Sequence, residues 1–230
     1  MFLQLILPVI ICFLPLIAAV IVFSVVNKLK PVRILLIILL GLAAVVPISI
    51  VQFFIPDLTI PGISPVMYTI IKCLVLYGLV EEVLKAAALI PVANRKNTLM
   101  QNLLYAFIFG LTVGCFESVV YYIEHLQTAL LREGQVLYFQ IFSRIFTTDI
   151  IHMACAGLGG LFIVSCKFKK PKITCLIDAV LIHGFYDFFA SFQGEMGWLR
   201  YFAIPVILLS LLECRIKYTA LQEKTNICEK

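Results

Sequence analysis

The sequence predicts an all-α fold, a polytopic membrane helix bundle with about seven transmembrane helices. Of the 230 residues, 62% are apolar and only 13% are charged, whereas roughly a quarter of the residues in an average soluble domain are charged. The apolar residues also fall in long runs, and about 20 of them in succession can cross a hydrocarbon core roughly 30 Å thick. No Gly/Ser linker, low-complexity tract or internal repeat divides the chain. We therefore expect one domain, embedded in the lipid bilayer.

Seven runs are long enough to span a bilayer. They cover residues 2–26, 34–54, 66–92, 100–123, 144–166, 173–192 and 197–214. The first run has no basic start and is longer than a signal-peptide core of roughly 7 to 15 residues, so we expect a retained helix. Residues 55–65, IPDLTIPGISP, hold three Pro and one Gly, which predicts a break after the second run. Residues 124–143 are expected to form the longest loop, with a helical piece at the membrane interface.

The basic residues predict how the chain is oriented in the membrane. Thirteen of the 18 Lys and Arg residues lie at 28–33, 95–96, 167–172 and 215–230, on alternate connections between the runs. Short cytoplasmic loops retain positive charge, so the N-terminus is expected outside and the C-terminus in the cytoplasm. The net charge of +5 is then a topology signal, and nucleic acid is not an expected partner.

Ionisable residues interrupt four of the runs. A charged residue at the centre of a membrane helix costs about 2.5 to 3.5 kcal/mol, so several of them indicate a functional site. They are Glu81, Glu82, Lys85, Glu117, Asp149, His152, Asp178, His183 and Asp187. The chain is thus expected to comprise two N-terminal transmembrane helices and an external loop (1–65), a four-helix core that carries the site (66–192), and a last helix with a cytoplasmic tail (193–230).

The expected depth in the bilayer groups these residues further. A helix rises about 1.5 Å per residue, which places five of them in one layer between the middle and the outer third of the membrane. These are Glu82, His183, His152, Asp187 and Glu117. Polar residues that only packed helices together would have no reason to share a depth. Asp149 and Asp178 lie about one turn from the ends of their runs, where solvated or structural roles are expected.

Helical spacing pairs residues within two of the runs. Glu81 and Lys85 are four residues apart, as are His183 and Asp187, so each pair shares a helical face. Lys85 can also reach Glu82, three residues before it. A carboxylate held in this way can take a proton from water, and an imidazole can polarise a carbonyl group or protonate a leaving amine. Either pair alone could equally be a structural ion pair or a helix-packing hydrogen bond.

Four motifs follow one another along the predicted core. They are EEVLK at 81–85, GLTVGCFESVVYY at 110–122, HMACAGLGG at 152–160 and HGFYDFF at 183–189. The ordered set resembles the PrsW family of glutamate-type intramembrane proteases, relatives of the CAAX-protease and bacteriocin-processing (CPBP) superfamily. Two positions of the second motif depart from the usual family pattern, with Val113 in place of Phe and Ser118 in place of Asn.

The resemblance implies peptide hydrolysis by a glutamate-activated water, without a covalent acyl-enzyme. The implied catalytic residues are Glu81, Glu82, Lys85, Glu117, His152, His183 and Asp187. One of the two adjacent glutamates would deprotonate water, and the sequence leaves open which one. Both are not expected to face the same point, because neighbouring side chains on a helix diverge by about 100°. The implied substrate is a membrane-anchored, single-span protein resembling an anti-sigma factor, cut near the outer side of a bacterial cytoplasmic membrane. Nothing in the sequence indicates the oligomeric state.

No cofactor is expected for such a mechanism. The chain has no HExxH zinc motif, no GxSxG motif and no pair of GxGD aspartates, which argues against the common metallo-, serine and aspartyl proteases. Zinc or another divalent metal is the alternative, and its expected ligands would be Glu82, Glu117, His152 and His183.

Two other functions compete with the protease. A non-enzymatic membrane scaffold of the APH-1 type would share the fold, and a proton-coupled transporter would also use ionisable residues inside a bundle. Transporters usually show internal repeats and interrupted helices near the midplane, and the sequence shows neither. A scaffold does not require a full set of acid, base and imidazole groups. An intramembrane endopeptidase is therefore the leading hypothesis.

Overall fold

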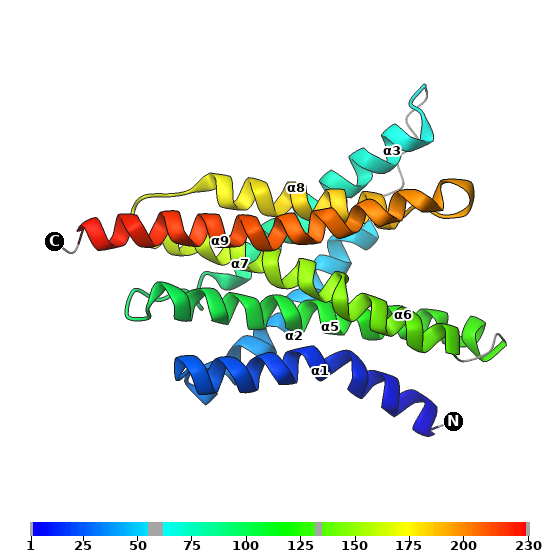
Figure 1. Cartoon of the computed structure of the whole chain (residues 1–230), viewed down its shortest axis with the longest axis horizontal. Coiled ribbons are helices and arrows are strands. Elements are labelled where there is room, and N and C mark those ends of the chain that lie inside the picture. The colour runs from blue at the N-terminus through cyan, green and yellow to red at the C-terminus, as the bar shows by residue number, and fades with distance from the viewer. Residues whose placement is uncertain (1, 55–61, 132–134, 229–230) are drawn as a thin grey trace.

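The computed structural model describes residues 2–54, 62–131 and 135–228, and every regular element in these ranges is a helix (Figure 1). The helices form one elongated bundle in which α1, α5, α7 and the pair α8 and α9 follow one another across the molecule. Five helical segments are long and apolar enough to cross a membrane, and they span 6–27, 31–54, 99–124, 139–167 and 173–190. The predicted all-α membrane bundle is therefore confirmed, while the number of crossings stays a prediction.

The first two helices agree with the first two apolar runs. Helix α1 (Phe2–Asn27) packs against α5, and α2 (Pro31–Phe54) packs against α4 and α5. The short turn between them carries Lys28 at a φ of 51°. Few of the described side chains of either helix are buried, as expected for helices in contact with lipid.

The third predicted run, 66–92, is helical but not one regular helix. It consists of α3 (Pro65–Lys72), the π-helix η1 (Cys73–Leu79) and α4 (Val80–Leu89). The Ser64 hydroxyl caps α3 by accepting a hydrogen bond from the Met67 amide at 3.3 Å. Of the predicted break at 55–65, residues 55–61 lie outside the described part of the chain. The π-helical stretch is notable because such segments often occur beside functional residues.

The long loop expected at residues 124–143 is wrong, because most of this stretch is helical in the described part of the chain. The helical piece expected there is present, and its place at the membrane interface stays a prediction. Helix α5 (Leu99–Leu131) continues past Glu124, and α6 (Gln135–Phe146) begins soon afterwards. The segment EHLQTALL that follows Tyr121–Ile123 contains no Gly or Pro, so nothing in it ends the helix. Helix α6 is followed by α7 (Thr148–Lys167) after an irregular residue, Thr147, at φ −123° and ψ −79°.

The last predicted run, 197–214, also differs from the structure. After α8 (Ile173–Ala190) the chain forms a 3₁₀ helix, η2 (Gly194–Phe202), before α9 (Ala203–Cys228) begins. Helix α9 therefore starts later than predicted and continues well beyond residue 214. Its second half is polar, so the apolar pattern could not define where it ends.

Helix α7 lies at the centre of the bundle, between α4, α5, α8 and α9. Small residues permit this close packing. A methyl group at Gly110 of α5 would overlap the carbonyl oxygen of His152 in α7. Between η1 and α8, a methyl group at Gly78 would overlap the Val180 carbonyl oxygen, and one at Gly184 would lie 2.8 Å from the Leu74 Cα atom. These approaches bring α4, α7 and α8 close enough for their polar side chains to meet.

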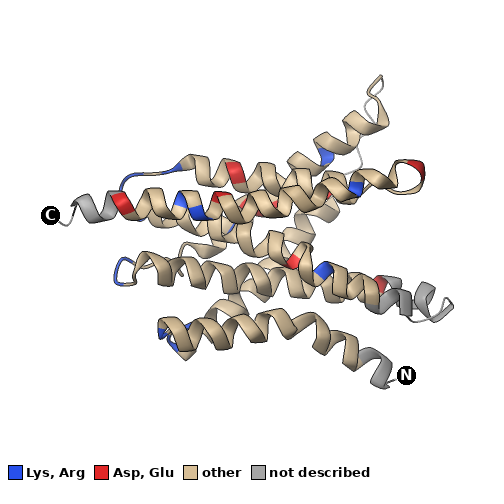
Figure 2. Ribbon diagram, viewed as in Figure 1, with Lys and Arg blue, Asp and Glu red and all other residues tan. Residues whose placement is uncertain are grey.

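The charged residues mark the two ends of the bundle. Lys and Arg of the short connections gather at the end that carries the C-terminus, opposite the N-terminus (Figure 2). At this end, Lys167 Nζ donates a hydrogen bond to the Ile90 carbonyl oxygen at 2.6 Å, which satisfies a free carbonyl group near the end of α4. This distribution agrees with the expected topology, although which end faces the cytoplasm stays a prediction.

Candidate active site

Polar side chains from α4 and α7 meet around Lys85. The Lys85 Nζ atom lies 2.8 Å from Glu82 Oε1 and 2.9 Å from Glu81 Oε1, and 2.8 Å from His152 Nδ1. Lys85 has no exposed surface, and Glu81, Glu82 and His152 are also buried. A buried ammonium group needs such partners because an unpaired charge in a low-dielectric interior is costly.

The second histidine comes from α8. His183 Nδ1 lies 2.6 Å from Glu82 Oε1, and its Nε2 lies 3.4 Å from Asp187 Oδ2. The rings of His183 and His152 are 5.0 Å apart, nearly perpendicular at 76°. Glu82 therefore links α4 to α8, and the two imidazoles lie side by side. The close approach of Gly78 and Gly184 allows this contact because larger residues would push α8 away.

Glu117 of α5 completes the group from the opposite side. Its Oε2 atom lies 2.5 Å from His152 Nε2, and its Oε1 atom accepts a hydrogen bond from Arg144 Nη2 at 2.7 Å. An ammonium group can only donate, so Lys85 donates to His152 Nδ1. For a neutral His152, Nε2 then carries the proton and donates to Glu117. The imidazole is held in one tautomer from both sides.

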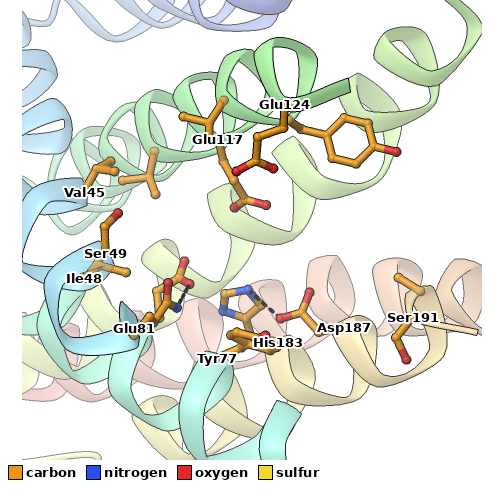
Figure 3. A pocket seen from close by; sticks show the side chains of 15 residues that line it. Val45, Ile48, Ser49, Tyr77, Glu81, Glu117, Glu124, His183, Asp187 and Ser191 are labelled. Atoms are coloured by element: carbon orange, nitrogen blue, oxygen red, sulfur yellow. Dashed lines mark hydrogen bonds and ion pairs between the residues drawn. The ribbon is translucent and has the colours of Figure 1, made fainter. Parts of the chain in front are cut away.

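A cavity of about 600 Å³ opens beside this cluster. Glu81, Glu117, His183 and Asp187 line its polar side, and Val45, Ile48 and Ser49 of α2 line the other (Figure 3). Gln52 of α2 also lines it and donates from Nε2 to Glu81 Oε2 at 3.4 Å. Glu82 and Lys85 are not among its lining residues. A molecule in the cavity would therefore meet Glu81 before Glu82.

The structure brings all seven predicted site residues into one connected group. The prediction that Glu81 and Glu82 could not face the same point holds only in part, because both carboxylates reach Lys85 Nζ. Their remaining contacts differ, since Glu81 faces the cavity and Glu82 faces His183. The geometry alone does not assign a role to either residue.

Several residues of the site are absent from the sequence prediction. Ser49 and Gln52 come from α2, which lacks ionisable groups in its middle, and Arg144 comes from the end of α6. The available signal for α2 was a pair of polar residues three positions apart in an otherwise apolar stretch. Arg144 also lies over the Tyr121 ring at 4.5 Å, so it joins α6 to α5.

The two remaining aspartates differ from each other. Asp149 is fully buried and accepts a hydrogen bond from the Ser118 hydroxyl at 3.1 Å. Of the two roles expected for Asp149, solvated or structural, the structure supports the structural one, because α6 precedes α7 and packs against its start. Asp178 lies apart from the site and pairs with Lys217 Nζ at 2.6 Å.

A model of the PrsW family of intramembrane metalloproteases matches residues 30–212 of the chain. The chain belongs to this family. At the level of the family it is an intramembrane protease, and its apolar helices make it an integral membrane protein. No curated protein and no solved structure matches it. Placement of this PrsW-family chain in the wider CPBP superfamily stays a prediction.

The PrsW family is described as metalloproteases, and the site offers suitable ligands. Donor atoms of Glu81, His152 and His183 lie within 4.8 Å of one another. Two imidazoles and one carboxylate form a common ligand set for catalytic zinc. Glu82 Oε2 is buried without a hydrogen-bond partner among the described residues, so the cluster has a further free acceptor. The residues therefore fit a divalent metal, with Glu81 in place of the predicted Glu82 and Glu117.

Proposed function

We propose that this PrsW-family chain is an intramembrane endopeptidase in which Glu81 activates the attacking water. The observation that carries the proposal is the position of Glu81, which lines the cavity, lies 2.9 Å from Lys85 Nζ and lies 3.2 Å from His152 Nδ1. Lys85 favours the ionised form of Glu81 because an opposite charge stabilises a buried carboxylate. An ionised carboxylate at the cavity wall can accept a proton from water.

Hydrolysis then needs two proton transfers. Glu81 takes one proton from water while the oxygen forms a bond to the carbonyl carbon of the peptide, and the carbonyl electron pair moves onto its oxygen. The C–N bond then breaks as that pair returns, and the leaving amine takes up a proton. His183 is suited to supply this proton because it lines the cavity and is oriented by Glu82 and Asp187. No bond between enzyme and peptide forms in this sequence.

The other residues of the site act by positioning their neighbours. Glu82 holds Lys85 and His183 together through its Oε1 atom, at 2.8 and 2.6 Å. Glu117 holds His152 in the tautomer that accepts from Lys85. We assign Glu82 and Glu117 positioning roles, because Glu82 does not line the cavity, and Glu117, which does, contacts His152 and Arg144.

The proposed substrate is a single-span membrane protein of the anti-sigma-factor kind, cut near the outer side of a bacterial cytoplasmic membrane. The cavity lining includes Glu81 and continues to Glu124 of α5 and to Ser191 at the end of α8, and we expect it to take the peptide in extended form. A peptide bond within an intact helix has its carbonyl oxygen in a backbone hydrogen bond and the neighbouring turns around it, so water and catalytic groups reach it poorly. The substrate segment is therefore expected to unwind before cleavage.

A metal-dependent form of the same activity is the second candidate. Four carboxylates, Glu81, Glu82, Glu117 and Asp187, face only two permanent cations, Lys85 and Arg144. Protonation of His183 would balance part of this negative charge, and a divalent cation would balance all of it. Glu81, His152 and His183 would hold the cation, which when bound would polarise the peptide carbonyl and make water more acidic. Lys85 disfavours binding of a metal cation there, because its ammonium group already occupies the position next to Glu81 and His152.

The test is cleavage of a single-span reporter by the purified protein in lipid vesicles. Wild type should cut the reporter at one site, identified by mass spectrometry of both products. Glu81→Gln should lose about 10²- to 10⁴-fold in rate, while Glu213→Gln on α9, whose side chain pairs with Lys217, should cleave normally. Uncut reporter with wild type, together with proton flux across the vesicle wall, would favour the transporter. Uncut reporter without flux would favour the scaffold.

Chelation separates the two forms of the mechanism. Unchanged cleavage after treatment with a strong divalent-metal chelator, in protein shown by elemental analysis to be free of metal, supports the glutamate mechanism. Loss of cleavage that returns on addition of zinc or manganese assigns the reaction to the metal-dependent form. Metal content of the Glu81→Gln and His152→Ala variants provides an independent readout, because loss of a ligand should lower it.

A further inference from the structure

The cavity is poorly suited, by charge alone, to the oxygen that becomes negative during peptide hydrolysis. Its described lining includes four carboxylates and no Lys or Arg. The lining carboxylates are Glu81, Glu117, Glu124 and Asp187. Negative groups repel a developing oxyanion, and enzymes usually place hydrogen-bond donors around it. The proposed peptidase activity therefore requires a donor within reach of Glu81.

The charged residues nearest to Glu81 are already engaged. Lys85 is fully buried behind Glu81 and Glu82, and it is not among the lining residues. His183 lines the cavity, with Nδ1 2.6 Å from Glu82 Oε1 and Nε2 3.4 Å from Asp187 Oδ2. The contact to Asp187 is long, and the proton on Nε2 is the one assigned to the leaving amine. Lys85 does not reach the cavity and His183 serves the leaving amine, so the carbonyl oxygen needs a different donor.

Gln52 of α2 has the missing property. Its side chain lines the cavity, and the group that faces Glu81 is its NH₂ because a carboxylate only accepts hydrogen bonds. The contact to Glu81 Oε2 is long, at 3.4 Å, so little is lost when the amide turns to another acceptor. Ser49 also lines the cavity (Figure 3). It lies three residues before Gln52, and this helical spacing puts the two side chains on one face of α2.

We propose that Gln52 donates a hydrogen bond to the carbonyl oxygen of the scissile peptide and stabilises the oxyanion of the tetrahedral intermediate, with Ser49 as a second donor. The inference rests on the proposed peptidase function. Water adds to the carbonyl carbon, Glu81 holds the proton, and the negative charge resides on the oxygen that Gln52 contacts. Helix α2 thus forms part of the catalytic apparatus, opposite the helices that carry the acid and the base.

The proposal is tested by steady-state kinetics of Gln52→Ala on the vesicle-bound protein. Removing one donor to an oxyanion typically lowers kcat by about 10²- to 10³-fold, and we expect this loss with a KM within about threefold of wild type. The pH-rate profile should keep its shape, because the variant removes a donor to the transition state and leaves Glu81 in its contacts with Lys85 and His152. Ser49→Ala should lower kcat less, by about two- to tenfold, because the Ser49 hydroxyl is only the second donor to the oxyanion.

Two control variants test whether the loss is specific to the NH₂ group of Gln52. Phe53→Ala alters the neighbouring residue, which is 83% exposed, and should cleave at the wild-type rate. Gln52→Asn retains the NH₂ donor on a shorter side chain and should recover part of the loss. A Gln52→Ala rate within threefold of wild type would overturn the proposal. So would a loss accompanied by a displaced pH-rate profile, which would show that Gln52 only positions Glu81. An inactive wild type would remove the proposed function itself, and this result is distinct from both.

Discussion

Helices α1 and α7 are both apolar, yet their surroundings are opposite. In an apolar 18-residue stretch of α1, 11% of the residues are buried, compared with 78% in the corresponding stretch of the segment 139–167 that contains α7. Helix α1 carries no Asp, Glu, Lys, Arg or His, whereas α7 carries Asp149 and His152 among small residues. Apolar length alone therefore identifies a membrane helix, and the polar and small residues within it identify the helix that packs inside.

The physical reason lies in the solvent. Lipid tails are as apolar as Leu or Ile, so a side chain of α1 gains little by leaving lipid for the protein interior. A buried polar group such as His152 has no water to bond, and it must find partners on neighbouring helices. Small residues permit the helices to approach closely enough for these partners to meet. Three changes test this contrast, in order of expected effect.

The largest effect is expected at His152 of α7. Replacement by Ala removes the group between Lys85 and Glu117 and leaves both charges without their shared partner. The cleavage rate should fall by about 10²- to 10⁴-fold. Val22→Ala on α1, where the side chain is 53% exposed, should cleave as wild type does. Equal losses in the two variants would show that the two helices do not differ in the way proposed.

A smaller effect is expected at Arg144, which extends the buried group from α7 to α6. Arg144 Nη2 holds Glu117 Oε1 at 2.7 Å, so Arg144→Gln should loosen Glu117 and lower kcat by about 10- to 100-fold, as partners of this kind usually do. Arg144→Lys should recover part of the rate, because it restores the charge without the two-nitrogen fork. An unaffected kcat in Arg144→Gln would show that Glu117 does not need its guanidinium partner.

The smallest effect is expected at the contact between α5 and α7, and it concerns stability. A methyl group at Gly110 would overlap the His152 carbonyl oxygen, so Gly110→Ala should lower the free energy of unfolding by about 1 to 3 kcal/mol. At Gly159 a methyl group would lie 3.8 Å from Ala86 Cβ. Gly159→Ala should therefore be neutral or stabilising by up to about 1 kcal/mol. Unfolding in mild detergent measures both, and equal stabilities would contradict the close approach.

The contrast also explains which parts of the site could be predicted from sequence. Glu81, Glu82 and Lys85 stand out because ionisable groups are costly in a membrane helix, and their spacing identifies the shared face. Gln52 and Ser49 carry no charge, so they cost little in an apolar run and the sequence does not mark them as site residues. Which helix Gln52 faces depends on how α2 packs against α4 and α5, and no pattern within α2 contains that information.

Backbone details were harder to predict than the side-chain cluster. The π-helix at Cys73–Leu79 leaves no mark in apolar periodicity, because it changes the hydrogen-bond register and not the residue types. Helix α5 continues through the start of the loop predicted at 124–143, because none of the polar residues that follow Glu124 in α5 is a helix breaker. Helix ends follow caps and breakers, and polarity alone does not define them.

The most direct test of the central claim compares Glu81→Gln with Glu82→Gln in the same cleavage assay. Glu81→Gln, which alters the carboxylate at the cavity wall, should lower the rate of the chemical step by about 10²- to 10⁴-fold while reporter binding persists. Glu82→Gln alters the carboxylate between Lys85 and His183, and should mainly lower stability and retain measurable cleavage. The reverse order, with full loss in Glu82→Gln and ready cleavage by Glu81→Gln, would contradict the account.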